Sequence, residues 1–320
     1  MSEALATAWR ECVRRADFEA AWQISDQALL ARSNFVGANG FRNSNWGGEP
    51  LDGKRVLVRC CYGLGDTLQF IRYVPLLRRI ARSVLVQAQA PIVKLLEHVD
   101  GIDCLTTREK TVAHEKYDVV IDLTELPHFF RTNLATIPAE IPYIDITPRK
   151  FSSTPNFRVG LVWCGSDWDP RRSLPVQYFA DFDQIRGVAL HILQRGSELL
   201  RRPSNFGIDS GNDDVYEAAR TMAGLDLMIT IDSMPAHLAG AMAVPTWVLL
   251  HSDCDWRWML KRTDSPWYPS MRLFRQTTAG DWGPVVARVR HELTRQVKSR
   301  RSISEPIRRA RELCRRPPNH

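Results

Sequence analysis

Long apolar runs are missing from this chain. No uninterrupted stretch approaches the roughly 18 residues that a membrane span needs. The amino terminus, MSEALATAWRECVRRADFE, mixes acidic and basic side chains and lacks the charged-then-apolar order of a secretory signal. We therefore expect a cytoplasmic protein. With 320 residues and 44% hydrophobic content, the chain can bury a sizeable core, and its length suggests about two domains.

Cysteine pairs at metal-binding spacing are also missing. The seven cysteines are scattered, odd in number and never spaced C-x-x-C. This pattern indicates neither a disulfide framework nor a zinc site. We interpret the cysteines as reduced and mostly buried.

Most of the chain has no net charge, although the full sequence carries +7. From Arg295 onward there are nine Lys and Arg residues and two Glu residues. The preceding residues contain 34 basic and 34 acidic side chains. A neutral body argues against a broad nucleic-acid footprint. The basic tail, 295–320, has two interpretations. It is a solvated terminal helix, or it contacts the anionic inner face of a membrane, which is worth about 1 kcal/mol per basic residue.

The amino-terminal part is helical in pattern. Residues 3–32 carry apolar residues at helical spacing with a break near Ala16 and Asp17, which predicts a helical hairpin. One hairpin resembles a single tetratricopeptide-type unit, and no repeat of that period follows. Residues 34–52, rich in Gly and Asn, are typical of a linker.

From Lys54 short β-branched runs alternate with helical patterns, and after the stretch ITPRKFSSTPNF the alternation restarts. Near-continuous apolar strands separated by helices predict parallel sheets covered on both faces. We therefore predict two similar α/β domains on either side of about Ser153. The predicted strands are KRVLVRC, SVLVQA and DVVIDL in the first domain, and FRVGLVW, ALHILQ, DLMITI and TWVLL in the second.

The stretch RCCYGLGDTL (59–68) lacks two features of a dinucleotide-binding fingerprint. Leu68 stands where a third small residue belongs, and the second strand, ending VQAQA, offers no acidic residue, which argues against an NAD enzyme. What remains is a tight turn with Gly63 and Gly65 that presents Asp66 at the end of a parallel strand, where open α/β sheets bind ligands. Asp66 is either the N-cap of the next helix or a general base toward a hydroxyl.

Two stretches of the second domain, GLVWCGSDWDPRRSLP (160–175) and ITIDSMPAHLAGAMAVPTWVLL (229–250), follow strands in equivalent positions. A helix start with free N–H groups is an anion site, and arginines nearby suit a diphosphate. The alternative is that these side chains cap helices or pack in the core. The candidate donors are Gly165, Ser166, Arg171 and Arg172 in the first stretch and Asp232, Ser233 and His237 in the second.

Several motifs together resemble bacterial glycosyltransferase family 9, the heptosyltransferase-like group, and in particular its branch attached to tetratricopeptide repeats. They are GLGDTLQFIRYVPLLRR, VGLVW-G, the D-x-RRS-P pattern, DSMPAHLAGAMAVP and DWRW…SPWYPSMRLFRQ, and the resemblance covers about residues 46–294. It implies a GT-B fold, in which two Rossmann-like domains face a cleft. The domains would be a hairpin and linker (1–45), an acceptor domain (46–152), a nucleotide-sugar donor domain (153–294) and the basic tail (295–320).

The resemblance also implies roles for the candidate residues. Asp66 matches the carboxylate proposed as catalytic base in the family, with Gly63 and Gly65 in the acceptor-side loop. Asp232, Ser233 and His237 match the element that contacts donor phosphates and sugar, and Gly165 and Ser166 match the first loop of the donor domain. Heptosyltransferases place a lysine after that loop; here SDWDPRRS offers Arg171 and Arg172, so the donor sugar does not carry over.

The leading hypothesis is an inverting, metal-independent glycosyltransferase that moves a sugar from a nucleotide sugar to a glycan, lipid-linked or protein hydroxyl, with no cofactor. Asp66 would take the proton, and the start of the second helix, His237 and an arginine would stabilise the departing diphosphate. Three D-x-D pairs occur, but 22 aspartates in 320 residues give about 1.5 by chance, so we expect no metal.

Two other functions fit the pattern. A degenerate GT-B protein would bind a nucleotide sugar or glycan without turnover, and a nucleotide-sugar 2-epimerase shares the two-domain plan. The aromatic stretch DWRWMLKRTDSPWYP is expected to pack at the domain base, with stacking of a nucleobase or sugar on Trp256, Trp258 or Trp267 as the alternative.

Overall fold

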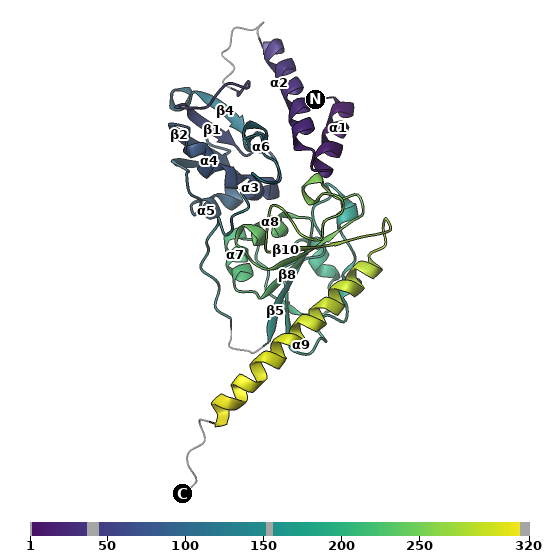
Figure 1. Ribbon diagram of the computed structural model, residues 1–320. Coiled ribbons are helices and arrows are strands. Elements are labelled where there is room, and N and C mark those ends of the chain that lie inside the picture. The colour runs from purple at the N-terminus through teal and green to yellow at the C-terminus, as the bar shows by residue number, and fades with distance from the viewer. Residues whose placement is uncertain (1, 37–44, 152–155, 314–320) are drawn as a thin grey trace.

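The computed structural model describes residues 2–36, 45–151 and 156–313. It contains two parallel sheets, an amino-terminal helical hairpin and a long carboxy-terminal helix (Figure 1). The fold is α/β with two Rossmann-like halves, as predicted. The proposed domain boundary near Ser153 falls among residues 152–155, outside the described ranges.

The first sheet has four parallel strands in the order β3-β2-β1-β4. Its middle strands are near-continuous apolar runs, so both faces are buried under helices. The carboxyl end of β1, next to β4, is the point where the strand order reverses. The strands are β1 (Arg55–Arg59), β2 (Ser83–Ala88), β3 (Cys104–Thr107) and β4 (Val119–Asp122), and the helices are α3 (Leu64–Phe70), α4 (Val74–Arg78), α5 (Val93–Leu96) and α6 (Leu126–Phe129).

The second sheet has six parallel strands in the order β10-β9-β8-β5-β6-β7. Counted from β5, this is the doubly wound order 3-2-1-4-5-6, whose reversal between β5 and β8 is where such sheets bind ligands. The strands are β5 (Phe157–Leu161), β6 (Val188–Ile192), β7 (Ile208–Asp209), β8 (Leu227–Ile231), β9 (Thr246–Leu250) and β10 (Met271–Arg275), and the helices between them are α7 (Val215–Ala223) and α8 (Met234–Ala241).

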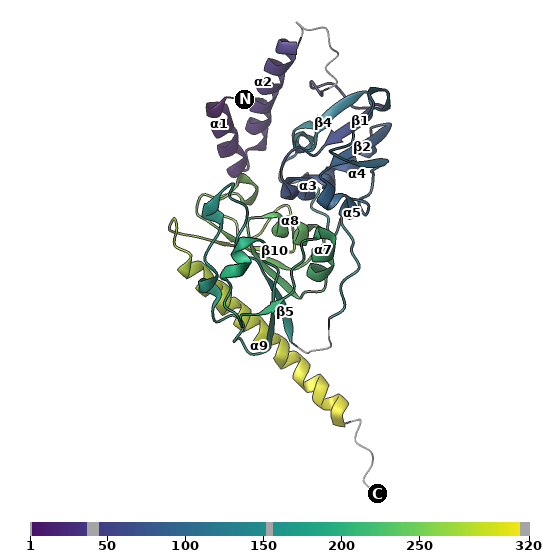
Figure 2. The same cartoon turned by 180° about the vertical axis from the view of Figure 1, so that it is seen from behind.

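The helical hairpin, α1 (Glu3–Arg14) and α2 (Phe18–Val36), breaks at Ala16 as predicted. It contacts both domains. The Trp22 indole donates to the Thr132 carbonyl of the first domain at 2.7 Å. On the second domain, the Trp9 ring packs edge-on against Trp256 at 5.2 Å. Figures 1 and 2 show the hairpin beside the first domain with its turn directed at the second. The hairpin therefore joins the two domains at one edge.

The carboxy-terminal helix α9 (Gly283–Leu313) lies along the second domain and continues beyond it (Figures 1 and 2). Its first half packs through buried Val289, Leu293 and Val297. The predicted tail beginning at Arg295 is therefore the continuation of a packed helix. None of the helices in the part of the chain that the structure describes combines the length and apolar character needed to cross a bilayer.

The two domains share an apolar interface. Phe70 of α3 lies 6.2 Å from the Trp256 ring and 5.9 Å from the Trp267 ring of the second domain. The backbone N–H groups of Tyr143 and Ile144, on the segment between the domains, donate to the Ala241 carbonyl at the end of α8. These contacts bring α3 and α8 together, and the loops that precede both helices meet at this interface.

Candidate functional site

Asp66 lies in the first turn of α3, and both of its carboxylate oxygens are engaged. Oδ2 accepts the Gly63 backbone N–H at 2.9 Å, and Oδ1 accepts from the guanidinium of Arg257, which belongs to the second domain. The alternative that Asp66 is the N-cap is wrong, because α3 begins at Leu64 and its N-cap is Gly63. The Asp66 side chain is 28% exposed, so the carboxylate is oriented by two donors and still reaches solvent.

Arg257 joins the two domains. It comes from the short 3₁₀ turn η8 (Trp256–Trp258) of the second domain. Its Nη1 donates to Asp255 Oδ1 at 2.8 Å, and its Nε donates across the interface to Gln69 Oε1 at 2.6 Å. The guanidinium also lies 4.8 Å from the Trp256 ring centroid. These contacts with Asp255, Gln69 and Trp256 restrain the Arg257 guanidinium, which in turn holds the Asp66 carboxylate toward the second domain.

Gly65 makes the closest approach between the two loops. A Cβ built on Gly65 would lie 2.9 Å from His237 Cδ2 and 3.6 Å from the Met234 Cα. Real Cβ atoms do not approach other heavy atoms within 3.0 Å, so only glycine allows α3 to pack this closely on α8. The predicted acceptor-side loop and the predicted donor-side helix are in direct contact.

The start of α8 is shaped as an anion site. Ser233 occupies the N-cap position, but its hydroxyl donates to the Ile231 carbonyl at 3.4 Å and does not cap the helix. In the first turn Pro235 has no N–H, and the Ala236 N–H donates to the Ser233 carbonyl at 2.9 Å. The favourable contribution to a negative charge at this end is therefore the helix dipole. A Cβ on Gly165 would lie 3.6 Å from the Ser233 Cβ, so the loop after β5 lies against this helix start.

Arg172 ties that loop to α8. Its Nη1 donates to the Asp232 carbonyl at 2.7 Å, and its Nη2 lies 3.3 Å from the Ser166 carbonyl and 3.4 Å from Ser166 Oγ. Arg172 is only 8% exposed. The sequence-predicted donor residues Ser166, Arg172, Asp232 and Ser233 thus meet in one place.

His237 is buried in the first turn of α8. Its Nδ1 lies 3.0 Å from the Tyr268 hydroxyl, and its ring stacks on Trp258 with centroids 5.6 Å apart. Burial lowers the pKa of His237 well below its usual range, and the guanidinium groups of Arg257, Arg72 and Arg172 act in the same direction. The imidazole is therefore neutral. If the phenol donates to Nδ1, the imidazole proton sits on Nε2 and can be donated to a ligand.

Three arginines therefore converge on His237, and two of them, Arg72 and Arg257, were not predicted from the sequence. Arg72 belongs to the first domain and donates a hydrogen bond to the Trp267 carbonyl of the second domain. Its guanidinium lies 4.4 Å from the centre of the Tyr268 ring. Of these arginines, Arg257 is paired with the Asp66 and Asp255 carboxylates.

Asp232 carries a perturbed carboxyl group. Burial raises the pKa of Asp232 to about 7, and the neighbouring Asp255 carboxylate adds to the rise, while Arg257 and Arg172 oppose it. A buried carboxyl that titrates near neutrality beside two arginines is typical of functional sites.

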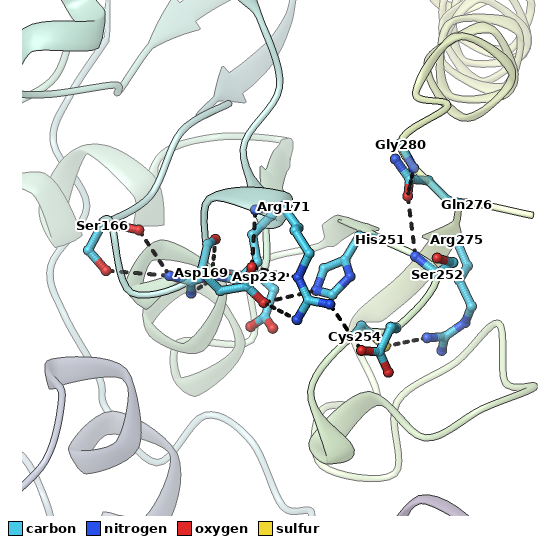
Figure 3. A network of polar contacts seen from close by, with 12 residues as sticks. Ser166, Asp169, Arg171, Asp232, His251, Ser252, Cys254, Arg275, Gln276 and Gly280 are labelled. Carbon is cyan, nitrogen blue, oxygen red and sulfur yellow. Dashed lines mark hydrogen bonds and ion pairs between the residues drawn. The ribbon is translucent and has the colours of Figure 1, made fainter. Parts of the chain in front are cut away.

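Arg171 donates to two carboxylates and not to Ser166, Asp232 or Ser233. Its Nε and Nη2 donate to the Asp169 carboxylate at 2.9 and 2.8 Å, and its Nη1 donates to Asp253 at 3.0 Å. Asp253 also accepts from Arg14 of the hairpin. Figure 3 shows Arg171 and His251 beside Asp169, and His251 Nε2 lies 3.5 Å from Asp169 Oδ2. The prediction that Arg171 binds the donor stays a prediction, and the structure already balances its charge with two carboxylates.

The aromatic stretch mainly packs, as expected. Trp258 and Trp267 are at most 1% exposed, which leaves no face for a ligand, and Trp256 contacts the hairpin and Phe70. Among the described residues no group of three or more His, Cys, Asp or Glu side chains is arranged to hold a metal ion.

The chain matches no model of a known protein family. It is 23% identical over 283 residues to Protein FlbA of Caulobacter vibrioides, covering 76% of this chain and 47% of that protein, so it spans about half the length of this relative. Two solved structures share the fold. They are a glycosyl transferase family 9 protein of Veillonella parvula (14% identity, TM-score 0.53, 71% of this chain and 87% of that one) and the E. coli ADP-heptose lps heptosyltransferase II (13%, 0.54, 77% and 99%).

Both solved structures resemble this chain in fold. The chain therefore has the GT-B architecture of the heptosyltransferase-like glycosyltransferases.

Proposed function

We propose that the chain is an inverting, metal-independent glycosyltransferase. The observation that carries the proposal is that Arg257 of the second domain binds the Asp66 carboxylate of the first, while the adjacent Gly65 packs against His237 of α8. Transfer needs a group that takes a proton from the acceptor and a group that stabilises a departing diphosphate. We assign the first role to Asp66 and the second to Arg172 and the start of α8.

In the proposed step the acceptor oxygen forms a bond to the anomeric carbon of the donor sugar, and its proton passes to Asp66. The bond between that carbon and the diphosphate oxygen breaks, and its electron pair leaves with the diphosphate. Arg172, the first turn of α8 and the neutral His237 receive the new negative charge. One such donor typically lowers the barrier by about 2.7–4 kcal/mol.

The donor is proposed to be a nucleotide sugar, and the acceptor a hydroxyl of a glycan, a lipid-linked saccharide or a protein. The heptosyltransferase that shares the fold is named for ADP-heptose. Here the corresponding loop carries Arg172 in the site where a lysine would be expected, so we leave the sugar and the nucleotide open. Peripheral contact of the basic tail with an anionic membrane remains a prediction.

The test is release of nucleoside diphosphate from a panel of ADP-, UDP- and GDP-sugars with mixed hydroxyl acceptors. We expect sustained release by the wild-type protein and loss of release in Asp66→Ala. Asp100→Ala, an exposed carboxylate of the same domain, is the matched control and should keep the wild-type rate. Equal rates for Asp66→Ala and the control would reject the base assignment.

A non-catalytic nucleotide-sugar binder is the second candidate. It is favoured by the engagement of both Asp66 oxygens and by the neutralised Arg171. Binding without release across the whole panel would support it, and multiple turnovers would exclude it.

A further inference from the structure

One tryptophan of this chain stands apart from the others. Seven of the ten are at most 7% exposed, and Trp9 and Trp256 pack against the core. Trp168 is 73% exposed. An indole is usually buried because it removes a large apolar area from water. Trp168 thus presents a large apolar ring to solvent beside the candidate site.

Trp168 lies in the loop that follows β5, two residues after Ser166. The Arg172 guanidinium lies 4.9 Å from the centre of its ring. The same guanidinium donates to Ser166 and to the Asp232 carbonyl. One cation thus contacts both the aromatic ring and the backbone that shapes the anion site.

This cation–π contact orients the indole. A guanidinium over one ring face is worth about 0.5–1 kcal/mol at an exposed position, and Arg172 itself is held by four hydrogen-bond acceptors. The ring is therefore restrained before a ligand arrives, which reduces the entropy lost on binding. Because Arg172 covers one face, a ligand can reach the other.

We propose that Trp168 is a stacking platform for the donor's transferable sugar ring. The inference rests on the proposed function, in which Ser166, Arg172 and the start of α8 hold the diphosphate. The transferred sugar is bonded directly to that diphosphate, whereas the nucleobase is separated from it by a ribose. A ring adjoining Arg172 is thus placed for the sugar, whose C–H face packs against an indole.

The experiment compares binding of matched pairs, namely ADP and ADP-glucose, UDP and UDP-glucose, and GDP and GDP-mannose, by isothermal titration. For the pair that wild-type protein binds, Trp168→Ala should weaken the nucleotide sugar about five- to thirty-fold. The nucleoside diphosphate alone should change less than about two-fold. Trp168→Phe should recover most of the loss, because a phenyl ring also offers a flat face.

Tyr178→Ala is the matched control, since it removes another exposed aromatic, 43% exposed, from the same domain. It should leave both affinities unchanged. Equal weakening of sugar-bearing and sugar-free nucleotides by Trp168→Ala would show base stacking and overturn the proposal, as would unchanged binding of both. Absence of wild-type binding to every pair would instead remove the proposed function, and this inference with it.

Discussion

Replacing Gly65 by alanine tests whether the two domains meet as closely as the structure shows. The added Cβ would lie 2.9 Å from His237 Cδ2, and ordinary carbon contact begins at about 3.5 Å. His237 cannot easily yield, because it is stacked on Trp258 and bonded to Tyr268. Helices α3 and α8 must therefore move apart by about half an ångström.

Two opposing effects set the magnitude. Alanine in place of glycine in a helix stabilises by up to about 1 kcal/mol, whereas overpacking a filled interface costs about 1–3 kcal/mol. We expect a net loss of about 1 kcal/mol in the free energy of unfolding. The displacement should also lower the transfer rate by at least about ten-fold, since a shift of 1 Å can cost about 100-fold.

The assay is a double-mutant cycle measured by urea unfolding. Gly65→Ala is combined with His237→Ala, which removes the clashing ring, and Gly283→Ala, whose Cβ would make an ordinary 3.4 Å contact, serves as the control. In the His237→Ala background the Gly65→Ala penalty should vanish, giving a coupling energy of about 1–2 kcal/mol. A Gly65→Ala protein that is more stable than wild type, with no coupling to His237, would refute the close approach.

Two further predictions concern charge. Asp232→Asn should raise the melting temperature more at pH 8 than at pH 5. Burial raises the pKa of Asp232 to about 7, so ionising this carboxyl destabilises the folded protein. The destabilisation grows as pH rises from the unfolded-state pKa and levels off above about pH 7. An equal gain at both pH values would contradict this. Arg14→Ala should lower the free energy of unfolding by about 1–2 kcal/mol, since Arg14 donates to both the Asp253 carboxylate and the Cys254 carbonyl. Arg15 is exposed, so the control Arg15→Ala should lower it by less than about 0.5 kcal/mol. Equal effects of the two substitutions would show that Arg14 does not anchor the hairpin to the second domain.

The parallel strands that are buried on both faces could be predicted from the sequence. β9 coincides with the predicted run TWVLL. The bounds of β1, β2 and β8 differ from those of the predicted runs by at most one residue at either end. Strands with exposed residues were missed. β7 has only two residues, both exposed, and β10, MRLFR, interrupts its apolar residues with arginines. Apolar periodicity marks burial, so edge strands leave little signal.

The site was predictable where its residues follow strands. Ser166 and Ser233 follow β5 and β8, whose carboxyl ends lie at one edge of the second sheet, and Asp66 follows β1 of the first sheet. Arg72 and Arg257 were not predictable in the same way. Their contacts depend on how one domain docks on the other, and an arginine in a helical or aromatic stretch is indistinguishable in sequence from a solvated one.

The hairpin illustrates the same limit. Its helices follow from apolar spacing, and its turn follows from the break at Ala16. That it contacts both domains depends on long-range pairs, such as Trp22 with Thr132 and Arg14 with Asp253. No local pattern specifies such partners.

The most direct measurement of the central claim is a single-turnover comparison of wild type and Asp66→Asn on the nucleotide sugar that the panel identifies. The asparagine keeps an oxygen for Arg257 and cannot accept the acceptor proton as a carboxylate does. We predict donor affinity within about two-fold of wild type and a transfer rate lower by about 10²–10⁴-fold. Transfer by Asp66→Asn at the wild-type rate would contradict the role of this carboxylate and, with it, the account of how the two domains act together.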